Sequence, residues 1–165
     1  MVTPAGASGW AQPTLIIVCG LPGSGKTTLA RSLATERSGI RLCPDEWLAA
    51  LEITLWDERV RSRVEQLQWE LAQDLLRLGN LVIIEWGTWG GDERKLLRTQ
   101  ARLLGARVEL VFLDPPLDEL WRRVQRRGQV DPPITRSDLD DWDKLIQRPS
   151  ADELAGYDDS VVISA

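Results

Sequence analysis

Short hydrophobic runs alternate along this chain with segments in which hydrophobic residues recur every three or four positions. The first run, TLIIVCG at residues 14–20, is hydrophobic at nearly every position, which is typical of a strand that a parallel sheet buries on both faces. Further strands are predicted at 40–43, 81–87, 106–114 and 160–165. Strands separated in this way by helices indicate βαβ units and an α/β fold, a parallel sheet with helices on both faces.

The helices are recognised by the spacing of their hydrophobic residues. Residues 57–79 are predicted to form a long helix, because one face of it would carry Val60, Val64, Leu67, Leu71, Leu75 and Leu78. Gly79 and Asn80 tolerate the left-handed conformation that follows many helix ends. Further helices are predicted at 26–39, 46–51, 91–104 and 116–127.

Two segments show neither pattern. Residues 1–12 are expected to form a flexible N-terminal tail, followed by one domain over residues 13–165, because a chain of 165 residues fits a single domain. The segment RRGQVDPPITRSDLDDW is rich in proline and charge, and we interpret it as a small lid or loop near residues 128–148.

The composition excludes several classes of function. Acidic residues number 25 against 20 basic ones, and the net charge of −5 argues against a protein that coats long nucleic acid, whereas a short or terminal nucleic acid stays open as a substrate. The chain contains no histidine, which excludes Ser-His and Cys-His nucleophile pairs and histidine-ligated metals. Proton abstraction must therefore fall to a carboxylate, Lys or Tyr.

The cysteines and the N-terminal sequence bear on location. Cys19 and Cys43 each end a hydrophobic run, and we interpret both as buried structural residues rather than as a disulfide or a zinc site. The first residues lack the basic and apolar regions of a secretory signal, and no run is long enough to cross a bilayer. A cytoplasmic protein without a membrane partner is expected.

Residues 20–27, GLPGSGKT, match the Walker A pattern and stand between a predicted strand and a predicted helix. Glycine lets backbone N–H groups approach phosphate oxygens, and we expect a Cβ at Gly25 to close this cradle. Lys26 is predicted to stabilise charge on the transferred phosphate, and Thr27 to offer its hydroxyl to Mg²⁺. The predicted ATP-binding residues are Gly20, Leu21, Pro22, Gly23, Ser24, Gly25, Lys26, Thr27 and Thr28.

Two carboxylates follow predicted strands, at the edge of the sheet where ligands of such folds bind. Asp45, in LCPDEW, is a candidate general base for a substrate hydroxyl, and its alternative role is to cap the helix that begins there. Glu85, the only charge in LVIIEWG, is a candidate to hold the water shell of Mg²⁺ or to bond substrate, and otherwise is a plain strand-end carboxylate.

Three of the eight tryptophans, Trp47, Trp86 and Trp89, flank the strand ends where an acceptor is expected. An indole suits a stacked base or an apolar acceptor, and the alternative for each is packing in the core or at the rim of the site. The predicted substrate residues are therefore Asp45, Trp47, Glu85, Trp86 and Trp89.

The segment LWRRVQRRGQ places four arginines on a predicted helix. Residues three or four apart share a helix face, so Arg122 pairs with Arg126 and Arg123 with Arg127. We favour Arg123 and Arg126 as the arginines that stabilise charge on the transferring phosphoryl group, with Arg136 as a further candidate in the predicted lid. The alternative for each is a solvated helix face.

Taken with the Asp45 segment, VIIEWGTWG and FLDPPLDELWRRVQRR, the phosphate-binding motif resembles that of the small AAA-type P-loop kinases over roughly residues 14–127. Relatives of that family include the kinase domain of phage polynucleotide kinase, chloramphenicol phosphotransferase and zeta toxins. The resemblance implies strand order 2-3-1-4-5 and phosphorylation of a hydroxyl by Mg-ATP, and it matches Asp45 to the general base of the polynucleotide kinases.

The predicted function is accordingly an ATP-dependent kinase, with the acceptor hydroxyl on a small molecule or on a nucleotide or nucleic-acid end. Two alternatives remain, a P-loop NTPase switch and an ATP-binding module, each acting on a protein partner. ATP turnover that depends on a hydroxylated acceptor would distinguish the kinase from both.

Overall fold

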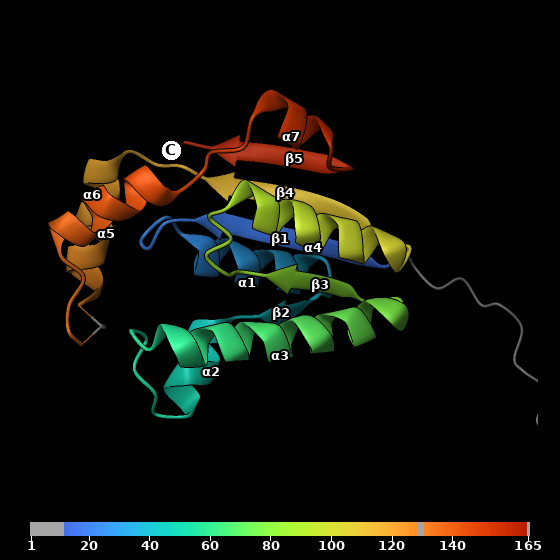
Figure 1. The fold of residues 1–165 in the computed structure, drawn as a ribbon, viewed down its shortest axis with the longest axis horizontal. Helices are drawn as coiled ribbons and strands as arrows, with labels where there is room; N and C mark the ends of the chain where they lie inside the picture. The colour runs from blue at the N-terminus through green and yellow to red at the C-terminus, as the bar shows by residue number, and fades with distance from the viewer. Residues whose placement is uncertain (1–11, 129–130, 165) are drawn as a thin grey trace, which may run out of the picture.

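A parallel sheet of five strands forms the centre of the protein, in a computed structural model that describes residues 12–128 and 131–164 (Figure 1). The strands are β1 (Thr14–Gly20), β2 (Ile40–Leu42), β3 (Leu81–Ile84), β4 (Arg107–Leu113) and β5 (Asp159–Ile163). Their order is β2-β3-β1-β4-β5, and every neighbouring pair is parallel. The predicted α/β fold and strand order are confirmed.

Helices connect the strands and cover the sheet (Figure 1). They are α1 (Lys26–Glu36), α2 (Pro44–Ala50), α3 (Glu58–Arg77), α4 (Gly91–Leu103), α5 (Leu117–Arg127), α6 (Arg136–Leu145) and α7 (Ala151–Ala155). Figure 1 shows α5 and α6 beyond one end of the sheet rather than over a face. Among the described residues, no helix is long and apolar enough to cross a membrane.

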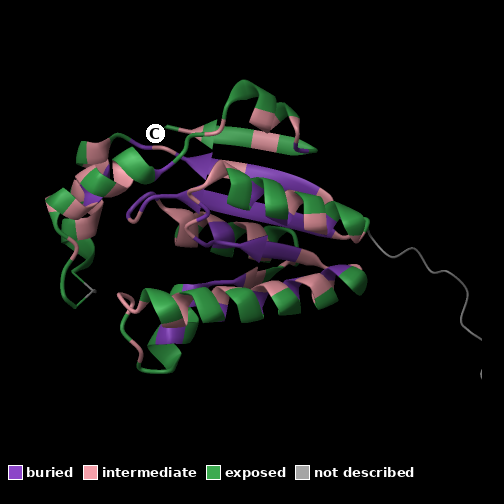
Figure 2. Ribbon diagram, viewed as in Figure 1, coloured by how far each residue is buried: buried purple, intermediate pink, exposed green. Residues whose placement is uncertain are grey.

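Strand β1 is buried on both faces, as its continuous hydrophobic sequence predicts (Figure 2). Leu15 and Ile17 belong to the larger core cluster, which includes residues of α3, α4, α5 and α6. Ile16 and Val18 belong to a second cluster, formed with α1. Successive side chains of one strand thus fill two cores on opposite faces of the sheet.

Helix α3 is present where the spacing predicts it, but its buried face differs from the prediction. Asp57 caps the helix by accepting a hydrogen bond from the Val60 N–H at 3.0 Å. The buried positions are Val64, Gln68, Ala72 and Leu76. Leu67, Leu71 and Leu78 are exposed, because the helix turns the smaller Ala72 and the polar Gln68 toward the sheet.

The segment predicted to be a lid or loop contains helix α6, which begins with a capping box formed by Thr135 and Asp138. Leu139 of α6 and Ile146 after it are buried in the larger core cluster. Helix α7 was not predicted at all. Residues 129 and 130 of the predicted lid, and residues 1–11 of the predicted tail, lie outside the described residues.

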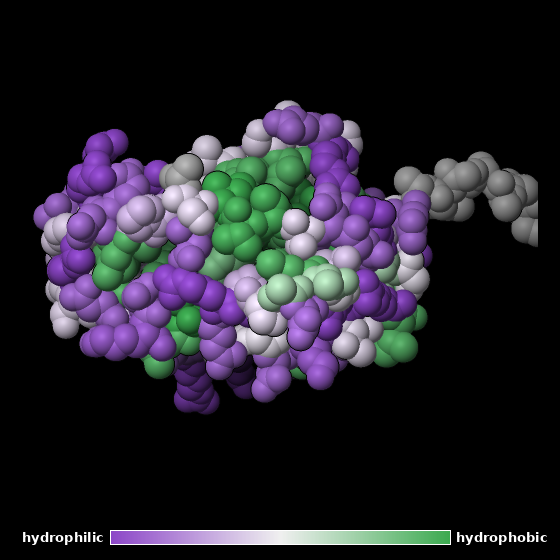
Figure 3. All heavy atoms as spheres, turned by 90° about the horizontal axis from the view of Figure 1, so that it is seen from above, coloured by the Kyte–Doolittle hydropathy of each residue, from purple (hydrophilic) through white to green (hydrophobic). Residues whose placement is uncertain are grey.

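Strand β5 forms one edge of the sheet and leaves Val161 and Val162 exposed by 46% and 41%. Figure 3 views the molecule from this side and shows a hydrophobic area near its centre, with hydrophilic surroundings. The predicted phosphate-binding turn and the two strand-end carboxylates lie away from this edge, after β1, β2 and β3.

Candidate active site

The turn between β1 and α1 is the P-loop that the sequence predicts, and three of its glycines have positive φ angles. Gly20, Gly23 and Gly25 adopt φ of 150°, 84° and 100°. A Cβ on Gly20 would lie 2.6 Å from the Leu113 carbonyl oxygen, and a Cβ on Gly23 would lie 3.0 Å from the Leu120 carbonyl oxygen. These two glycines are therefore required both by conformation and by close packing.

Gly25 corrects one expectation from the sequence. A Cβ at this position would meet no atom within 4 Å, so it would not close the cradle by contact. Gly25 is the residue just before α1, and its left-handed backbone is what favours glycine there. The N–H groups of the first turn of α1 then remain available to an anion, as at other helix N-termini.

Lys26 is folded back onto the loop that precedes it. Its Nζ donates hydrogen bonds to the carbonyl oxygens of Gly20 at 2.8 Å and Leu21 at 3.0 Å. Burial lowers the pKa of the ammonium group, and the nearby carboxylates of Asp45 and Glu85 only partly oppose this shift. Two carbonyl oxygens are therefore the hydrogen-bond partners of this ammonium group, and the carboxylates of Asp45 and Glu85 act on it electrostatically.

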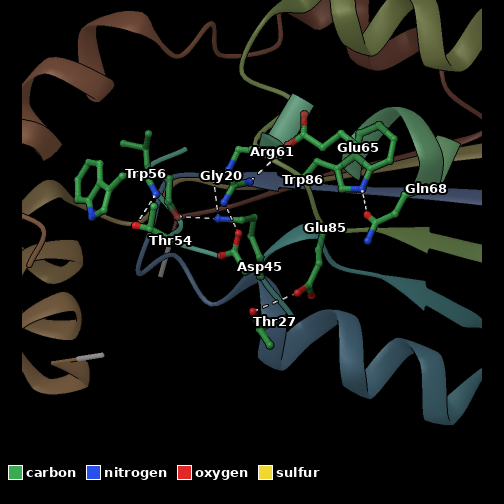
Figure 4. A network of polar contacts seen from close by, with 12 residues as sticks. Gly20, Thr27, Asp45, Thr54, Trp56, Arg61, Glu65, Gln68, Glu85 and Trp86 are labelled. Carbon is green, nitrogen blue, oxygen red and sulfur yellow. Dashed lines mark hydrogen bonds and ion pairs between the residues drawn. The ribbon is translucent and has the colours of Figure 1, made fainter. Parts of the chain in front are cut away.

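Glu85 lies directly after β3, and Figure 4 shows its contact with Thr27, one of two donors that share a single Glu85 oxygen. Oε1 accepts a hydrogen bond from Thr27 Oγ1 at 3.2 Å and from Arg41 Nη1 at 2.8 Å. The side chain of Glu85 is only 1% exposed. Its other oxygen, Oε2, is buried and has no partner among the described residues, which points to a ligand that is bound in the working site.

The residues present fit Mg²⁺. A threonine hydroxyl and a carboxylate oxygen are hard oxygen donors of the kind that Mg²⁺ prefers, and Glu85 Oε2 is an orphaned acceptor beside them. Within residues 12–128 and 131–164, no group of three or more Cys, Asp or Glu side chains is arranged to hold a metal by itself. Mg²⁺ does not require such a group, because it keeps several waters and binds substrate phosphates.

Asp45 lies in the first turn of α2, and its carboxylate forms an ion pair with Arg61 of α3 (Figure 4). The helix cap is Cys43, without a side-chain hydrogen bond, so the alternative in which Asp45 caps the helix is wrong. The Asp45 side chain is 55% exposed and the Arg61 side chain 27%. Arg61 also bonds Glu65 Oε1 at 3.3 Å, one turn further along α3.

The candidate arginines occupy different positions. Arg123 is half-buried and reaches the P-loop, where its Nη1 lies 3.4 Å from the Ser24 carbonyl oxygen and its Nε bonds Glu119 at 2.7 Å. Arg126 is exposed and has no hydrogen bond or ion pair among the described residues. Arg136 pairs with Asp118 at 2.8 Å and Asp140 at 3.1 Å, which links α6 to α5.

The three candidate tryptophans differ in how far they are buried. Trp86 is 4% exposed and belongs to the larger core cluster. It donates its indole N–H to Gln68 Oε1 at 2.9 Å, so its position is that of a packed core residue, the alternative named above. Trp89 is half-buried and lies 5.8 Å from Trp142 of α6, ring centre to ring centre. Trp47 is exposed on α2. An indole face is therefore available at Trp47 and, in part, at Trp89.

Both cysteines are free and buried, as the sequence predicts. Burial raises the pKa of the Cys43 thiol to about 12, and it also raises the pKa of Cys19. Cys19 Sγ donates to the carbonyl oxygen of Thr88 at 3.1 Å. Thiolate chemistry at neutral pH is thus disfavoured at both positions.

Sequence reasoning missed three side chains of this region, Arg41, Arg61 and Arg94. Arg41 had a visible signal, since an arginine interrupts the short hydrophobic strand β2, which pairs with β3 just before Glu85. Arg61 had no such signal. Arg59 and Arg63 lie close to it on the same helix, and the sequence does not show which of the three arginines faces the site. Arg94 is fully buried. The sequence contains no sign of this, because a charged residue in the first turn of a helix is usually exposed.

Comparison with known proteins gives a family and a fold. The sequence profile of the family described as AAA domain matches residues 15–149, and no curated protein matches the chain. A candidate kinase from Chloroflexus aurantiacus is 23% identical, with 93% of this chain and 88% of that chain covered and a TM-score of 0.70. A sugar kinase from a Janibacter species is 24% identical over 92% and 84% of the two chains, with a TM-score of 0.66.

A third structure contains ligands. The APS kinase of Mycobacterium tuberculosis, solved with AMPPNP and APS, is 22% identical over 92% of this chain and 89% of that chain, with a TM-score of 0.62. The TM-scores show that these proteins share a fold with this chain, and because the sequence identities are all below 25%, they show the fold alone. The fold is that of P-loop kinases.

Proposed function

The chain belongs to the AAA domain family, and on that premise we propose that it is an ATP-dependent kinase. It transfers the γ-phosphoryl group of ATP to a hydroxyl of a small molecule or of a nucleotide or nucleic-acid end. The observation that carries the proposal is the arrangement of two carboxylates around the P-loop. Glu85 accepts a hydrogen bond from Thr27 at 3.2 Å, and the exposed carboxylate of Asp45 acts electrostatically on Lys26, where it opposes the lowering of the lysine pKa by burial.

Asp45 is the general base in this proposal. Its carboxylate accepts the proton of the acceptor hydroxyl while the hydroxyl oxygen forms a bond to the γ-phosphorus and the bond to the bridging oxygen of ADP breaks. The side chain is 55% exposed, so an acceptor reaches it without unfolding of the site. Arg61 orients the carboxylate through its ion pair.

Positive charge on the nucleotide side stabilises the transferring group. Lys26 exchanges its two carbonyl partners for phosphate oxygens, and Arg123 approaches the same turn at the Ser24 carbonyl. Arg126 is exposed at the end of α5, where its guanidinium is free to contact phosphate. Preorganised charges of this kind are the main source of catalysis in phosphoryl transfer.

Thr27 and Glu85 are the residues that hold Mg²⁺, Thr27 by its hydroxyl and Glu85 through water. When bound, the ion neutralises charge on the phosphate oxygens. Arg41 donates at 2.8 Å to the same Glu85 oxygen as Thr27, so the carboxylate keeps its orientation beside the P-loop. Trp47 and Trp89 border the acceptor, and α6 acts as the lid that excludes water.

The test is transfer of the γ-phosphate from labelled Mg-ATP to a panel of acceptors: 5′-hydroxyl oligonucleotides, nucleosides, sugars, and aminoglycoside and phenicol antibiotics. The Lys26→Ala variant is the blank. Label on one class of acceptor supports the kinase and identifies its substrate class. Phosphate release that no acceptor stimulates would instead indicate an NTPase switch, and absence of any turnover would indicate an ATP-binding module.

A further inference from the structure

Arg94, in the first turn of α4, is a fully buried charged side chain that the proposed chemistry does not use. Its Nε and Nη2 bond the two carboxylate oxygens of Glu153 at 2.6 and 2.9 Å. The remaining donors go to backbone carbonyl oxygens: Nη1 to Thr88 at 3.0 Å and Trp89 at 3.1 Å, and Nη2 to Gln147 at 2.8 Å. The guanidinium also lies 5.7 Å from the Phe112 ring centre.

These contacts join two segments that are far apart in sequence. The acceptor loop, residues 85–90, follows β3 and carries Glu85 and Trp89. The return segment, residues 146–150, leads from α6 to α7. One more hydrogen bond connects them directly, from the Gln147 N–H to the Trp89 oxygen at 2.9 Å, and a second joins the return segment to the start of α4, from the Gly91 N–H to Gln147 Oε1 at 2.8 Å.

The buried guanidinium of Arg94 is costly in free energy, which indicates that its contacts have a role beyond stability. A buried charge is expensive unless it is paired and hydrogen-bonded, and well-packed hydrophobic residues often stabilise a core as well or better. Arg94 therefore contributes geometry that a hydrophobic side chain lacks, because its planar donors fix three carbonyl groups at once. Thr88 in this loop has a φ of 42°, a left-handed conformation that persists only where surrounding contacts hold it.

The acceptor loop is also held from the nucleotide side. Cys19, near the end of β1, donates its thiol to the Thr88 oxygen that Arg94 also bonds. On the opposite side, the Trp89 ring lies 5.8 Å from the ring of Trp142 in α6. The loop is thus clamped between the strand that leads into the P-loop and the helix of the proposed lid.

We propose that Arg94 is a positioning residue that clamps the acceptor loop to the return segment, so that the packing of α6 and α7 on the core fixes the wall of the proposed acceptor site. The kinase part of this inference rests on the proposed function, whereas the clamp itself does not. Arg94 is fully buried and its guanidinium bonds protein groups, so its role in this proposal is indirect. It sets where Glu85 and Trp89 stand, through the backbone that bears them.

The first experiment measures amide hydrogen exchange in the full chain for Arg94→Lys and for a matched control, Arg98→Lys. Arg98 lies one turn further along α4 and contacts the Glu153 carbonyl and the Tyr157 ring, but nothing in the acceptor loop. Lysine at 94 keeps the charge beside Glu153 and loses the fork that holds the carbonyls. Exchange in both the acceptor loop and the return segment is expected to accelerate on the order of tenfold in Arg94→Lys alone.

Equal exchange in the acceptor loop of Arg94→Lys and Arg98→Lys would overturn the clamp. If Arg94→Lys does not fold, Gln147→Ala takes its place, because Gln147 is exposed and its side chain supplies only the bond to the Gly91 N–H. Faster exchange at residues 88–91 in that variant supports the clamp, and unchanged exchange contradicts it.

The second experiment is kinetic and uses an acceptor identified by the transfer assay. Misplacement of the acceptor wall by a fraction of an ångström is expected to lower kcat/KM for the acceptor on the order of tenfold to a hundredfold, with KM for ATP nearly unchanged. A purely structural role would change both KM values together or neither. If no acceptor is phosphorylated, the proposed function fails, while hydrogen exchange still decides whether the clamp exists.

Discussion

The proposed nucleotide half of the site, residues 20–28, and the proposed acceptor half, the side chains around Asp45 and Glu85, are built in different ways. The nucleotide half is one stretch of chain, residues 20–28, whose binding groups are largely backbone N–H groups and whose lysine bonds carbonyl oxygens five and six residues away. The acceptor half joins side chains from separate elements, with Asp45 and Arg61 sixteen residues apart and Arg41 and Glu85 forty-four apart. A backbone site depends on local conformation, whereas a site of side chains depends on packing.

The largest effect is expected from Lys26→Ala, which removes the one full charge of the nucleotide half. Transfer should fall on the order of a thousandfold or more, because preorganised charge stabilises the transferring group. The fold should be retained, since Lys26 bonds only two carbonyl oxygens of its own loop. Labelled phosphate transfer and circular dichroism measure the two quantities, and an active variant that still binds ATP would refute the assignment of the phosphate site.

Asp45→Asn should affect the acceptor half alone. The amide cannot take the proton of the hydroxyl, so kcat should fall on the order of a hundredfold while ATP affinity stays the same. Steady-state kinetics and a direct ATP-binding titration separate these effects. The control is Asp92→Asn, an exposed acid in the first turn of α4 without an ion pair among the described residues. Unchanged turnover in Asp45→Asn would show that Asp45 is not the general base.

Arg61→Gln tests whether the acceptor half depends on its ion pairs. The neutral side chain no longer orients Asp45, and kcat/KM for the acceptor should fall roughly two- to fivefold, since an ion pair with a partner this exposed contributes about 0.2–1 kcal/mol. Arg63→Gln, on the same helix but exposed and without an ion pair in the described chain, should behave like the parent protein. A change in ATP affinity instead would mean that the two halves are not separable.

The smallest effect distinguishes two glycines of the nucleotide half. Gly23→Ala combines left-handed strain with a Cβ 3.0 Å from a backbone oxygen and should destabilise the protein by about 2 kcal/mol. Gly25→Ala meets open space and should cost about 1 kcal/mol for strain alone. Urea denaturation measures both free energies of unfolding. A larger loss for Gly25→Ala would show that its conformation matters more than the packing of Gly23.

Sequence patterns were informative where the physical cause is local. The hydrophobic run of β1 and the spacing of α3 predicted both elements, but the face of α3 was wrong because Gln68 bonds Trp86 and Ala72 allows close packing, which no periodicity shows. Strand β3 ends at Ile84, before Glu85, whereas the hydrophobic run predicted a strand as far as residue 87. The polar sequence after residue 128 concealed α6, whose buried Leu139 anchors it to the core.

The sequence by itself determined the parallel α/β sheet, the P-loop and the carboxylates at the strand ends, since these follow from residue types at short spacing. Only the tertiary structure decided which partners those carboxylates have, that Trp86 is a core residue, and that Arg94 joins the acceptor loop to the return segment. The reason is physical. Hydrogen bonds and ion pairs between distant segments depend on distances that the packing of helices on the sheet sets, and one sequence does not state those distances.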